Sequence, residues 1–345
     1  MIANLTDREK EILRCVVENF IFNAVPVGSR NISKQSDLNL SPATIRNVMS
    51  DLEEMELLRT PHTSAGRVPT DKAYRYYIDT LMGKEILQDA EIRSIKNQIN
   101  ELKNTVSEPE EIFSETSKIL GKISHMLAVV SEPLLTTGIF AKLELVSLSS
   151  TKILAVLNIR SGIVKTLILE LDSEILKSKL DRISSLLNER LAGLTLKEIK
   201  ETFSQRIGDL KSESPELIQL FINTIDKFYD EEKGGKIYLG GTSEIISQPE
   251  FIDMKNVKSI INLTEDRNFV VHIFQNSDLL NQNVSIKIGD ENADDKLKDL
   301  SVLATAYSLG DVKGKIGVIG PKRMNYAKMI TLLEYTSKLI TEMVM

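Results

Sequence analysis

The sequence predicts a multidomain α+β protein with a helical N-terminal part and a remainder that mixes strands with helices. The chain has 345 residues, which is enough for two or three domains. Apolar residues recur at helical spacing over the first 80 residues, whereas short β-like runs separated by turn residues begin near residue 143. No internal repeat or low-complexity tract is apparent, so we expect ordinary globular domains.

Composition and charge argue against several classes of protein. The net charge is −6, with 43 basic and 49 acidic residues, which disfavours a protein that coats nucleic acid non-specifically. The single cysteine, Cys15, excludes an intramolecular disulfide and a cysteine-based zinc site, and the three histidines lack metal-ligand spacing. No signal peptide is predicted, and no uncharged apolar run reaches the ~18 residues of a membrane span. We therefore expect a cytoplasmic protein with no membrane contact, metal or cofactor.

The first helix is predicted to begin at the T-x-x-E capping box formed by Thr6 and Glu9. One apolar stripe follows at helical spacing and comprises Ile12, Leu13, Val16, Val17, Phe20 and Ile21. Pro26 and Gly28 end this helix, and a short second helix is predicted from Ser29.

A third helix is predicted to open at Ser41 and Pro42, with serine as the N-cap and proline in the first turn. Its buried face consists of Ile45, Val48, Met49 and Leu52. Its outward face carries Ala43, Thr44, Arg46, Asn47 and Ser50. The free amides at the start of this helix are suited to hold a phosphate.

The segment 59–70 contains two prolines, a glycine and small hydroxyl residues, so it predicts a loop between short strands. Helix, turn, helix and hairpin is the order of a winged helix-turn-helix, in which the second helix of the pair enters the major groove. The outward residue types suit base edges, since arginine pairs with guanine and asparagine with adenine. The pattern alone also fits plain helical packing with Arg46 and Asn47 on a solvated face.

Charge placement favours DNA binding more than total charge does. Residues 29–50 carry a net charge of +2 and residues 59–77 carry +3, whereas the acids gather past the groove-facing turns. We expect Arg67 at or near the tip of the hairpin, where it meets a phosphate or the minor groove; the alternative is a loop arginine satisfied by water or by Asp71. The predicted DNA-binding residues are Ser41, Ala43, Thr44, Arg46, Asn47, Ser50, His62 and Arg67.

The rest of the chain predicts mixed structure. A linker helix is expected over 89–102, interrupted at Glu108 and Pro109. Strands are expected at 143–148, 153–159 and 163–171, which read as a meander, and later at 269–274, 284–288 and 316–319. Helices are expected at 173–191, 196–203 and 215–229, and at the end of the chain from 325 to 342.

No motif predicts an enzyme. The glycines near 234–241 and 314–320 match neither a phosphate-binding loop nor a dinucleotide fingerprint, and they read as packing and turn glycines. The acids at 290–295 read as a solvated loop, and Lys322 with Arg323 as a surface charge pair. Three scattered histidines offer no catalytic set, and Cys15 lies on the buried stripe of the first helix, where we expect it to be inert.

Two blocks carry a resemblance to a known family. Residues 40–53 (LSPATIRNVMSDLE) are followed by residues 61–70 (PHTSAGRVPT), and the second half contains GTS at 241–243, QPEF at 248–251, IGDEN at 288–292 and GKIGVIGPKRMNY at 314–326. In these residues the chain resembles the HrcA family of heat-inducible transcription repressors over nearly its whole length. Small departures, such as Val48 where many members carry an acid, remove no groove-facing basic residue.

The resemblance implies an architecture and a function. It implies a winged-helix DNA-binding domain at 1–82, a linker helix at 83–108, and a GAF-like α/β domain at 109–345 with a dimerising segment inserted at about 175–255. It further implies a homodimer that represses heat-shock (chaperone) genes from an inverted-repeat operator in double-stranded DNA. The GroE chaperonin would keep the repressor competent, and heat would divert it to unfolded clients.

Two other classes of function stay open at this point. A small-molecule-gated regulator is the alternative, because GAF-type domains elsewhere hold effectors; a well-formed apolar pocket in residues 105–345 would favour it. An enzyme fused to a DNA-binding domain needs a catalytic constellation, and the sequence offers none.

Overall fold

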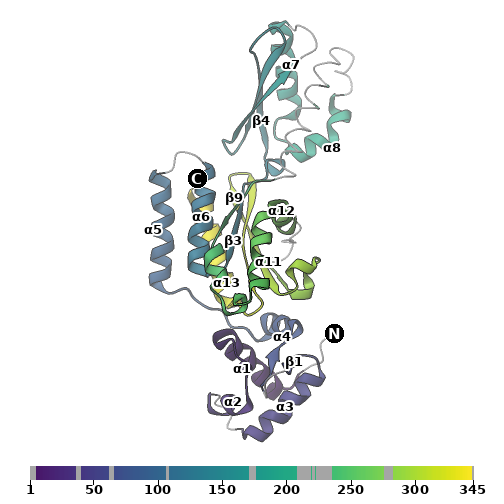
Figure 1. Cartoon of the computed structure of the whole chain (residues 1–345). Coiled ribbons are helices and arrows are strands. Elements are labelled where there is room, and N and C mark those ends of the chain that lie inside the picture. The colour runs from purple at the N-terminus through teal and green to yellow at the C-terminus, as the bar shows by residue number, and fades with distance from the viewer. Residues whose placement is uncertain are drawn as a thin grey trace.

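The computed structural model describes residues 5–35, 40–61, 66–105, 109–170, 176–207, 219, 222, 235–275 and 283–343. These residues form three bodies stacked along one direction (Figure 1). A helical N-terminal domain lies at one end, a body built on a five-stranded sheet lies in the middle, and a smaller lobe lies at the other end. The predicted multidomain α+β class is therefore confirmed.

The N-terminal domain has the predicted helix, turn, helix and hairpin order. It consists of α1 (Asp7–Asn23), α2 (Ser29–Gln35), α3 (Pro42–Glu54), the hairpin strands β1 (Leu58–Arg59) and β2 (Val68–Pro69), α4 (Asp71–Tyr76) and a π-helical turn (Tyr77–Leu81). The capping box is formed as predicted, because the Thr6 hydroxyl accepts the Glu9 amide at 3.3 Å and the Glu9 carboxylate accepts the Thr6 amide at 2.6 Å. The apolar stripe of α1 packs against the buried face of α3, so the hydrophobic effect holds the two helices together.

The middle body contains one antiparallel five-stranded sheet. Its strand order is β7 (Ile237–Gly240), β3 (Leu127–Ser131), β10 (Val312–Pro321), β9 (Leu300–Leu309) and β8 (Val284–Ile288). In the central register Val318 of β10 lies between Ala128 of β3 and Leu303 of β9. All three side chains are buried, because helices cover both faces of the sheet.

Each face of this sheet has its own layer of helices. One face packs on α6 (Pro109–Ser124) and α13 (Tyr326–Met343), with α5 (Asp89–Thr105) outside them. The other face packs on α11 (Met254–Glu265) and α12 (Arg267–Gln275), with the short α10 (Thr242–Ile246) at one side. The body is therefore a three-layer α/β/α arrangement.

The lobe is a second, separate sheet with its own helices. It comprises β4 (Phe140–Ser147), β5 (Lys152–Ile159), β6 (Val164–Glu170), α7 (Lys177–Leu191) and α8 (Leu196–Ile207). The open edge of β4 is tied to α7 by Asn188, whose side chain accepts from the Leu143 amide at 2.7 Å and donates to the Leu143 carbonyl at 3.0 Å. The lobe leaves the body after β3 and returns at β7.

The sheets divide the chain at other residues than the ranges expected from the sequence, and the dimerising role of residues 175–255 stays a prediction. The expected meander forms a sheet of its own in the lobe and does not join the body, so the inserted part begins before residue 140 and not near 175. The strand β7 and the helix α10 belong to the body, so the insertion ends before 237 and not near 255. The helix predicted as a linker is α5, which packs on α6 and α13 through the buried Ile95 and Ile99. The connection between domains is the extended segment 82–88.

One predicted strand is a helix. Residues 269–274 lie in α12, where Val270, Val271 and Phe274 are buried against the sheet. Asp266 accepts the Phe269 amide at 3.2 Å and so caps the start of this helix. The predicted strands at 284–288 and 316–319 are confirmed within β8 and β10, and the helix predicted at 215–229 lies largely outside the described residues.

Candidate DNA interface

The helix α3 is held rigidly by its cap and its core. The Ser41 hydroxyl accepts the Thr44 amide at 3.1 Å, which satisfies one of the free donors of the first turn. The preceding turn is tied to α2, since the Ser33 hydroxyl donates to the Leu40 carbonyl at 3.0 Å. Every residue predicted on the inner face is buried: Ile45, Val48, Met49 and Leu52. A helix fixed in this way can present its other face without ordering itself on binding.

The outer face of α3 brings the predicted base-reading residues into one stripe. Ala43, Arg46 and Asn47 are exposed at i, i+3 and i+4, and Ser50 follows one turn later, half-buried. Ser41 and Thr44 differ from these four, because their hydroxyls lie 3.0 Å apart and hydrogen-bond to each other within the cap. The structure thus separates an outward stripe, here called the reading face after its predicted role, from a capping pair among the predicted residues.

The wing is a short hairpin braced by the turn before α2. Leu58 pairs with Pro69 in its antiparallel strands, and Val27 forms a further bridge with Arg67 through backbone hydrogen bonds of 2.8 and 2.9 Å. Gly66 is required here, because a Cβ on it would lie 2.8 Å from the backbone carbonyl carbon of Pro26. The predicted site residue His62 lies outside the described residues.

Arg67 is not at the tip of the wing, contrary to the prediction. It directly precedes β2, and its Nη2 lies 2.8 Å from Glu53 Oε2 near the C-terminal end of α3. The same carboxylate accepts the Thr60 amide at 3.0 Å and the Thr60 hydroxyl at 2.6 Å. The Thr60 hydroxyl bond, helped by the charge of Arg67, lowers the pKa of Glu53. Glu53 therefore fastens both strands of the wing to α3.

The cationic patch predicted over 59–77 is largely neutralised. Besides Arg67, Lys72 lies 3.4 Å from Glu56, and Arg75 points away from α3 to Glu291, whose hydrogen bonds raise the pKa of Arg75. Of the four cations in that segment, Arg59 alone makes no ion pair among the described residues. The predicted net charge was correct, but the side chains that carry it serve the fold.

The cations available to DNA lie instead on α2 and α3. Arg30, Lys34 and Arg46 are exposed and make no ion pair with any residue that the structure describes. The first two were not among the predicted site residues, although the net charge of +2 over residues 29–50 was a usable signal. Helices α2 and α3 adjoin, so Arg30 and Lys34 lie on the helix next to the one that carries Arg46.

Two other kinds of feature, a metal site and a membrane span, are absent from the part of the chain that the structure describes. Within the described ranges, no group of three or more histidine, cysteine or acidic side chains is arranged to hold a metal ion. No helix in that part of the chain is long and apolar enough to cross a bilayer. Cys15 is half-buried, and burial raises the pKa of its thiol.

A capped helix that presents arginine and asparagine beside a hairpin wing, on a larger α/β body, defines a DNA-binding transcription regulator. Residues 4–81 match the family model described as winged helix-turn-helix transcription repressor, HrcA DNA-binding. Residues 110–330 match the model of the HrcA protein C-terminal domain. The chain belongs to the HrcA family of heat-inducible transcription repressors, so the resemblance is confirmed and the chain is a repressor and not an enzyme.

Full-length relatives agree with this assignment. The heat-inducible transcription repressor HrcA of Chlorobaculum tepidum is 41% identical over 347 residues, covering 98% of this chain and 97% of the relative. That of Chlorobium phaeobacteroides strain BS1 is 39% identical over 342 residues and covers 97% of both chains. Among solved structures, the crystal structure of a hypothetical protein is similar with a TM-score of 0.61 at 21% identity, covering 99% of both chains. That similarity supports the fold alone.

Proposed function

We propose that this protein is a homodimeric repressor that inserts α3 of each protomer into the major groove of an inverted-repeat operator upstream of chaperone genes. The observation that carries the proposal is the stripe of Ala43, Arg46, Asn47 and Ser50 on a helix whose opposite face is entirely buried. Arginine and asparagine are the residues that pair bidentately with guanine and adenine. Direct readout by α3 thus accounts for sequence specificity.

Phosphate contacts in this proposal come from the exposed cations beside α3. Arg30 and Lys34 on α2 and Arg59 at the base of the wing supply charge that no acid of the described residues neutralises. Such contacts fix register on the duplex and make binding depend on salt. The capped N-terminus of α3 at Ser41 adds free amides near the same backbone. His62 of the wing stays a prediction, and for Arg67, which pairs with Glu53, a wing-anchoring role is proposed in place of the predicted DNA contact.

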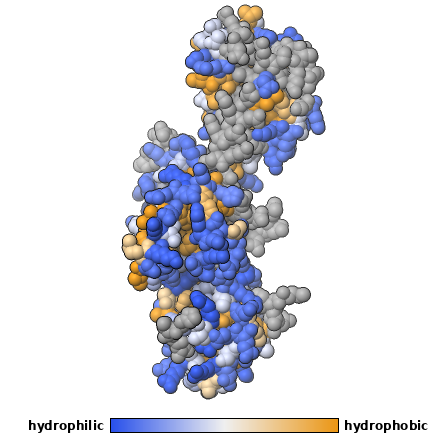
Figure 2. Space-filling view, turned by 45° about the vertical axis from the view of Figure 1, so that its right-hand side comes forward, coloured by the Kyte–Doolittle hydropathy of each residue, from blue (hydrophilic) through white to orange (hydrophobic). Residues whose placement is uncertain are grey.

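Dimerisation is proposed to use the outer face of the lobe sheet. Val146, Leu154 and Ile168 lie side by side across β4, β5 and β6, and Val146 and Ile168 are 45% and 56% exposed. Orange patches interrupt the hydrophilic surface of the lobe at the top of Figure 2. An apolar row across three strands is suited to a self-complementary two-fold contact. A two-fold axis there relates two recognition helices in the way an inverted repeat requires.

The body is proposed to be the GAF-like domain that the family resemblance implies. Its single antiparallel sheet between two helical layers supports this assignment. The same resemblance is the basis for proposing that the GroE chaperonin maintains the repressor and that heat relieves repression by diverting the chaperonin. The small-molecule-gated alternative rests on the GAF-like architecture alone. The repressor acts on DNA, so the cytoplasm is its proposed location.

The test is operator binding by variants of the reading face. Replacing Arg46 or Asn47 with alanine should cost about 1–3 kcal/mol per half-site on operator DNA and much less on scrambled DNA. Arg93→Ala is the matched control, because Arg93 is an exposed arginine on α5 in the body. An unchanged ratio of operator to scrambled binding in both variants would remove α3 as the reading helix. A footprint with and without the chaperonin tests the release mechanism separately.

A further inference from the structure

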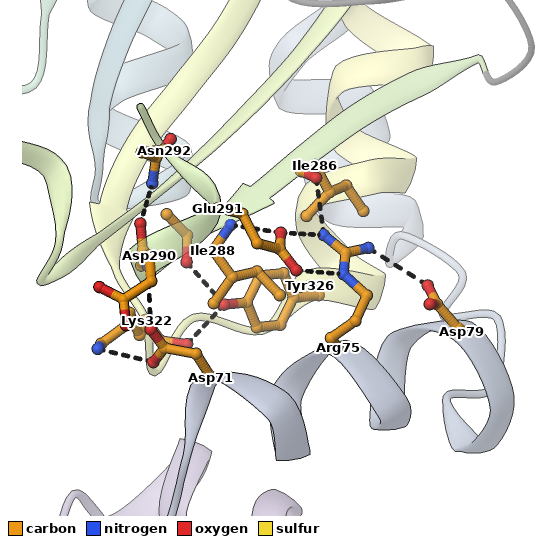
Figure 3. A network of polar contacts seen from close by, with 12 residues as sticks. Asp71, Arg75, Asp79, Ile286, Ile288, Asp290, Glu291, Asn292, Lys322 and Tyr326 are labelled. Atoms are coloured by element: carbon orange, nitrogen blue, oxygen red, sulfur yellow. Dashed lines mark hydrogen bonds and ion pairs between the residues drawn. The ribbon is translucent and has the colours of Figure 1, made fainter. Parts of the chain in front are cut away.

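The N-terminal domain meets the body through one covalent segment and a cluster of polar contacts. The segment 82–88 is extended. Its second half lies on α13, where the Glu85 carbonyl accepts the Thr331 hydroxyl at 2.7 Å and Leu87 is buried, whereas Gly83 and Lys84 are exposed and do not by themselves fix the angle between the two parts. The cluster, here called the junction, lies between α4 and the edge of the body that contains β8 and the start of α13 (Figure 3). Its contacts therefore decide how the domain is oriented.

Arg75 is the first element of the junction. It projects from α4 and makes a two-pronged ion pair with Glu291, with Nε–Oε1 at 2.8 Å and Nη2–Oε2 at 2.5 Å. Its Nη2 also donates to the Ile286 carbonyl of β8 at 2.8 Å, as Figure 3 shows. A planar guanidinium held on a carboxylate and a backbone oxygen has little freedom to rotate.

Asp71 is the second element, one turn earlier on α4. It lies 2.7 Å from Lys322 and accepts the Asp290 amide at 3.1 Å. Gly289 permits this approach, because it has a φ of +49° and a Cβ there would lie 1.8 Å from Asp71 Oδ2. The body backbone is thus shaped to receive a side chain of the N-terminal domain.

Arg323 is the third element and reaches in the opposite direction, from the body. Its side chain is 12% exposed, it forms a two-pronged pair with Glu250, and it donates to the Ile21 carbonyl near the end of α1. The sequence-based reading of Arg323 as part of a surface charge pair is therefore wrong. Between these polar contacts, the rings of Tyr74 and Tyr326 lie 6.0 Å apart.

We propose that Arg75 and Arg323 are positioning residues that hold the DNA-binding domain at a fixed angle to the body and so set the half-site spacing that the dimer accepts. The inference rests on the proposed function, since it assumes a dimer on an inverted repeat. Neither residue is part of the reading face: Arg75 points to the body, and α3 lies at the far end of its domain (Figure 1).

The physical reason is effective concentration. Once one half-site is occupied, the second domain binds at a local concentration that depends on how well its position matches the second half-site. A domain held by three sets of contacts matches one spacing well and others badly. A domain held only by segment 82–88 samples many positions, so it loses affinity for the matching spacing and loses discrimination against other spacings.

The experiment uses the full chain and variants on the body side, so that the DNA-binding domain stays unaltered. An inverted repeat is first selected from random DNA with the wild type, and derivatives are made with one base pair added or removed between half-sites. Glu291→Gln and Arg323→Gln should each weaken binding to the selected repeat roughly tenfold, which is about 1.4 kcal/mol. Both should bind an isolated half-site like the wild type and discriminate less between spacings.

The control is Lys328→Ala. Lys328 and Glu91 form a half-buried ion pair at 2.6 Å, with side chains 29% and 26% exposed, entirely within the body. This variant should keep the wild-type spacing preference.

The direction of the change in DNA affinity is also informative for Glu291→Gln. Removing a negative charge would by itself tighten DNA binding, whereas loss of the junction contact should weaken it. Trypsin should cut the exposed Lys84 of the connecting segment faster in both junction variants than in the control.

The outcomes are distinguishable. A wild type that binds no inverted repeat defeats the proposed function, whereas a wild type with a sharp spacing preference that both variants retain overturns this inference. If Glu291→Gln also loses binding to an isolated half-site, its spacing preference cannot be compared with that of the wild type. The double variant Arg75→Glu with Glu291→Arg, which exchanges the two charges, is then tested on the same DNA set. Recovery of the spacing preference in the exchanged pair supports positioning, and continued loss overturns it.

Discussion

Removing the Arg67 side chain should loosen the wing from α3 without changing the number of phosphates that the protein contacts. Arg67 and Glu53 lie 2.8 Å apart with side chains 18% and 33% exposed. Exposed ion pairs contribute about 0.2–1 kcal/mol, whereas truncating one partner of a fully buried pair costs about 3–5 kcal/mol. This pair lies between those limits, and Glu53 keeps its bonds to Thr60. We therefore expect Arg67→Ala to cost about 1–2 kcal/mol of wing stability, after allowance for solvent screening.

The assay combines a double-mutant cycle with a salt titration. Hydrogen exchange of the Thr60 amide, which donates to Glu53, reports wing opening in Arg67→Ala, Glu53→Gln and the double variant. The coupling energy should be about 1 kcal/mol. The slope of log affinity against log salt on operator DNA should match that of the wild type. A slope reduced by about one per half-site, with unchanged exchange at Thr60, would instead make Arg67 a phosphate contact and refute the wing-anchor reasoning.

The same pair predicts a pH dependence. The pKa of Glu53 is lowered in the folded protein, first by the Thr60 hydroxyl bond. The unfolded chain therefore takes up its proton at a higher pH than the folded chain does. The stabilisation is fully present above the ordinary value of 4.5 and is lost as the pH falls through the lower folded value. The protection of the Thr60 amide from hydrogen exchange should fall in that acid range. In Glu53→Gln the protection should not depend on pH in this way.

Three further outcomes are expected. Gly66→Ala should destabilise the wing by about 1–3 kcal/mol in hydrogen exchange, because its Cβ would meet Pro26 at 2.8 Å. Alkylation of Cys15 by iodoacetamide should be at least about tenfold slower in the native protein than in urea, since burial raises its pKa and limits access. Burial, with Glu18 nearby, raises the pKa of Tyr77 from 10 to about 12. The contribution of the neutral phenol to the free energy of unfolding should therefore be present below pH 10 and be lost between pH 10 and 12. A pH titration of phenolate absorbance in the wild type and in Tyr77→Phe measures this pKa, because the difference between the two curves belongs to Tyr77.

The DNA-binding domain was predictable because its signals are local. The capping box at Thr6, the cap at Ser41 and the apolar spacing of α1 and α3 all lie within a few residues of the elements they define. Short-range hydrogen bonds and helical periodicity can be read from one sequence. The stripe of Arg46 and Asn47 followed directly from the same periodicity.

The partners of the cations were not predictable. Arg75 and Glu291 are separated by 216 residues, and Arg323 donates to a carbonyl 302 residues away. Nothing near Arg75 in the sequence shows that it faces a second domain, so its charge was assigned to DNA. Arg67 and Glu53 are closer, but their contact depends on the path of the wing, which composition does not specify.

Buried elements account for the remaining differences between the secondary structure predicted from the sequence and that of the structure. The run at 269–274 is apolar and rich in β-branched residues, which fits a strand or a buried helix equally, and the cap at Asp266 favours the helix. The strand β9 was missed because it is buried on both faces and so lacks the alternation of a half-exposed strand. The meander was recognised as strands, but no sequence signal showed which sheet it joins.

The lobe is inserted between two neighbouring strands of the body sheet. Ser131 at the end of β3 pairs directly with Ile237 at the start of β7, and the Glu132 amide donates to the Lys236 carbonyl at 2.9 Å. The chain therefore leaves and re-enters the sheet across neighbouring antiparallel strands, where a tight two-residue turn can close a hairpin. A protein of this architecture can gain, lose or exchange the whole lobe in one genetic event while the sheet keeps its register. Under the proposed dimerisation through the lobe, the mode of self-association can evolve independently of the DNA sequence that the protein reads.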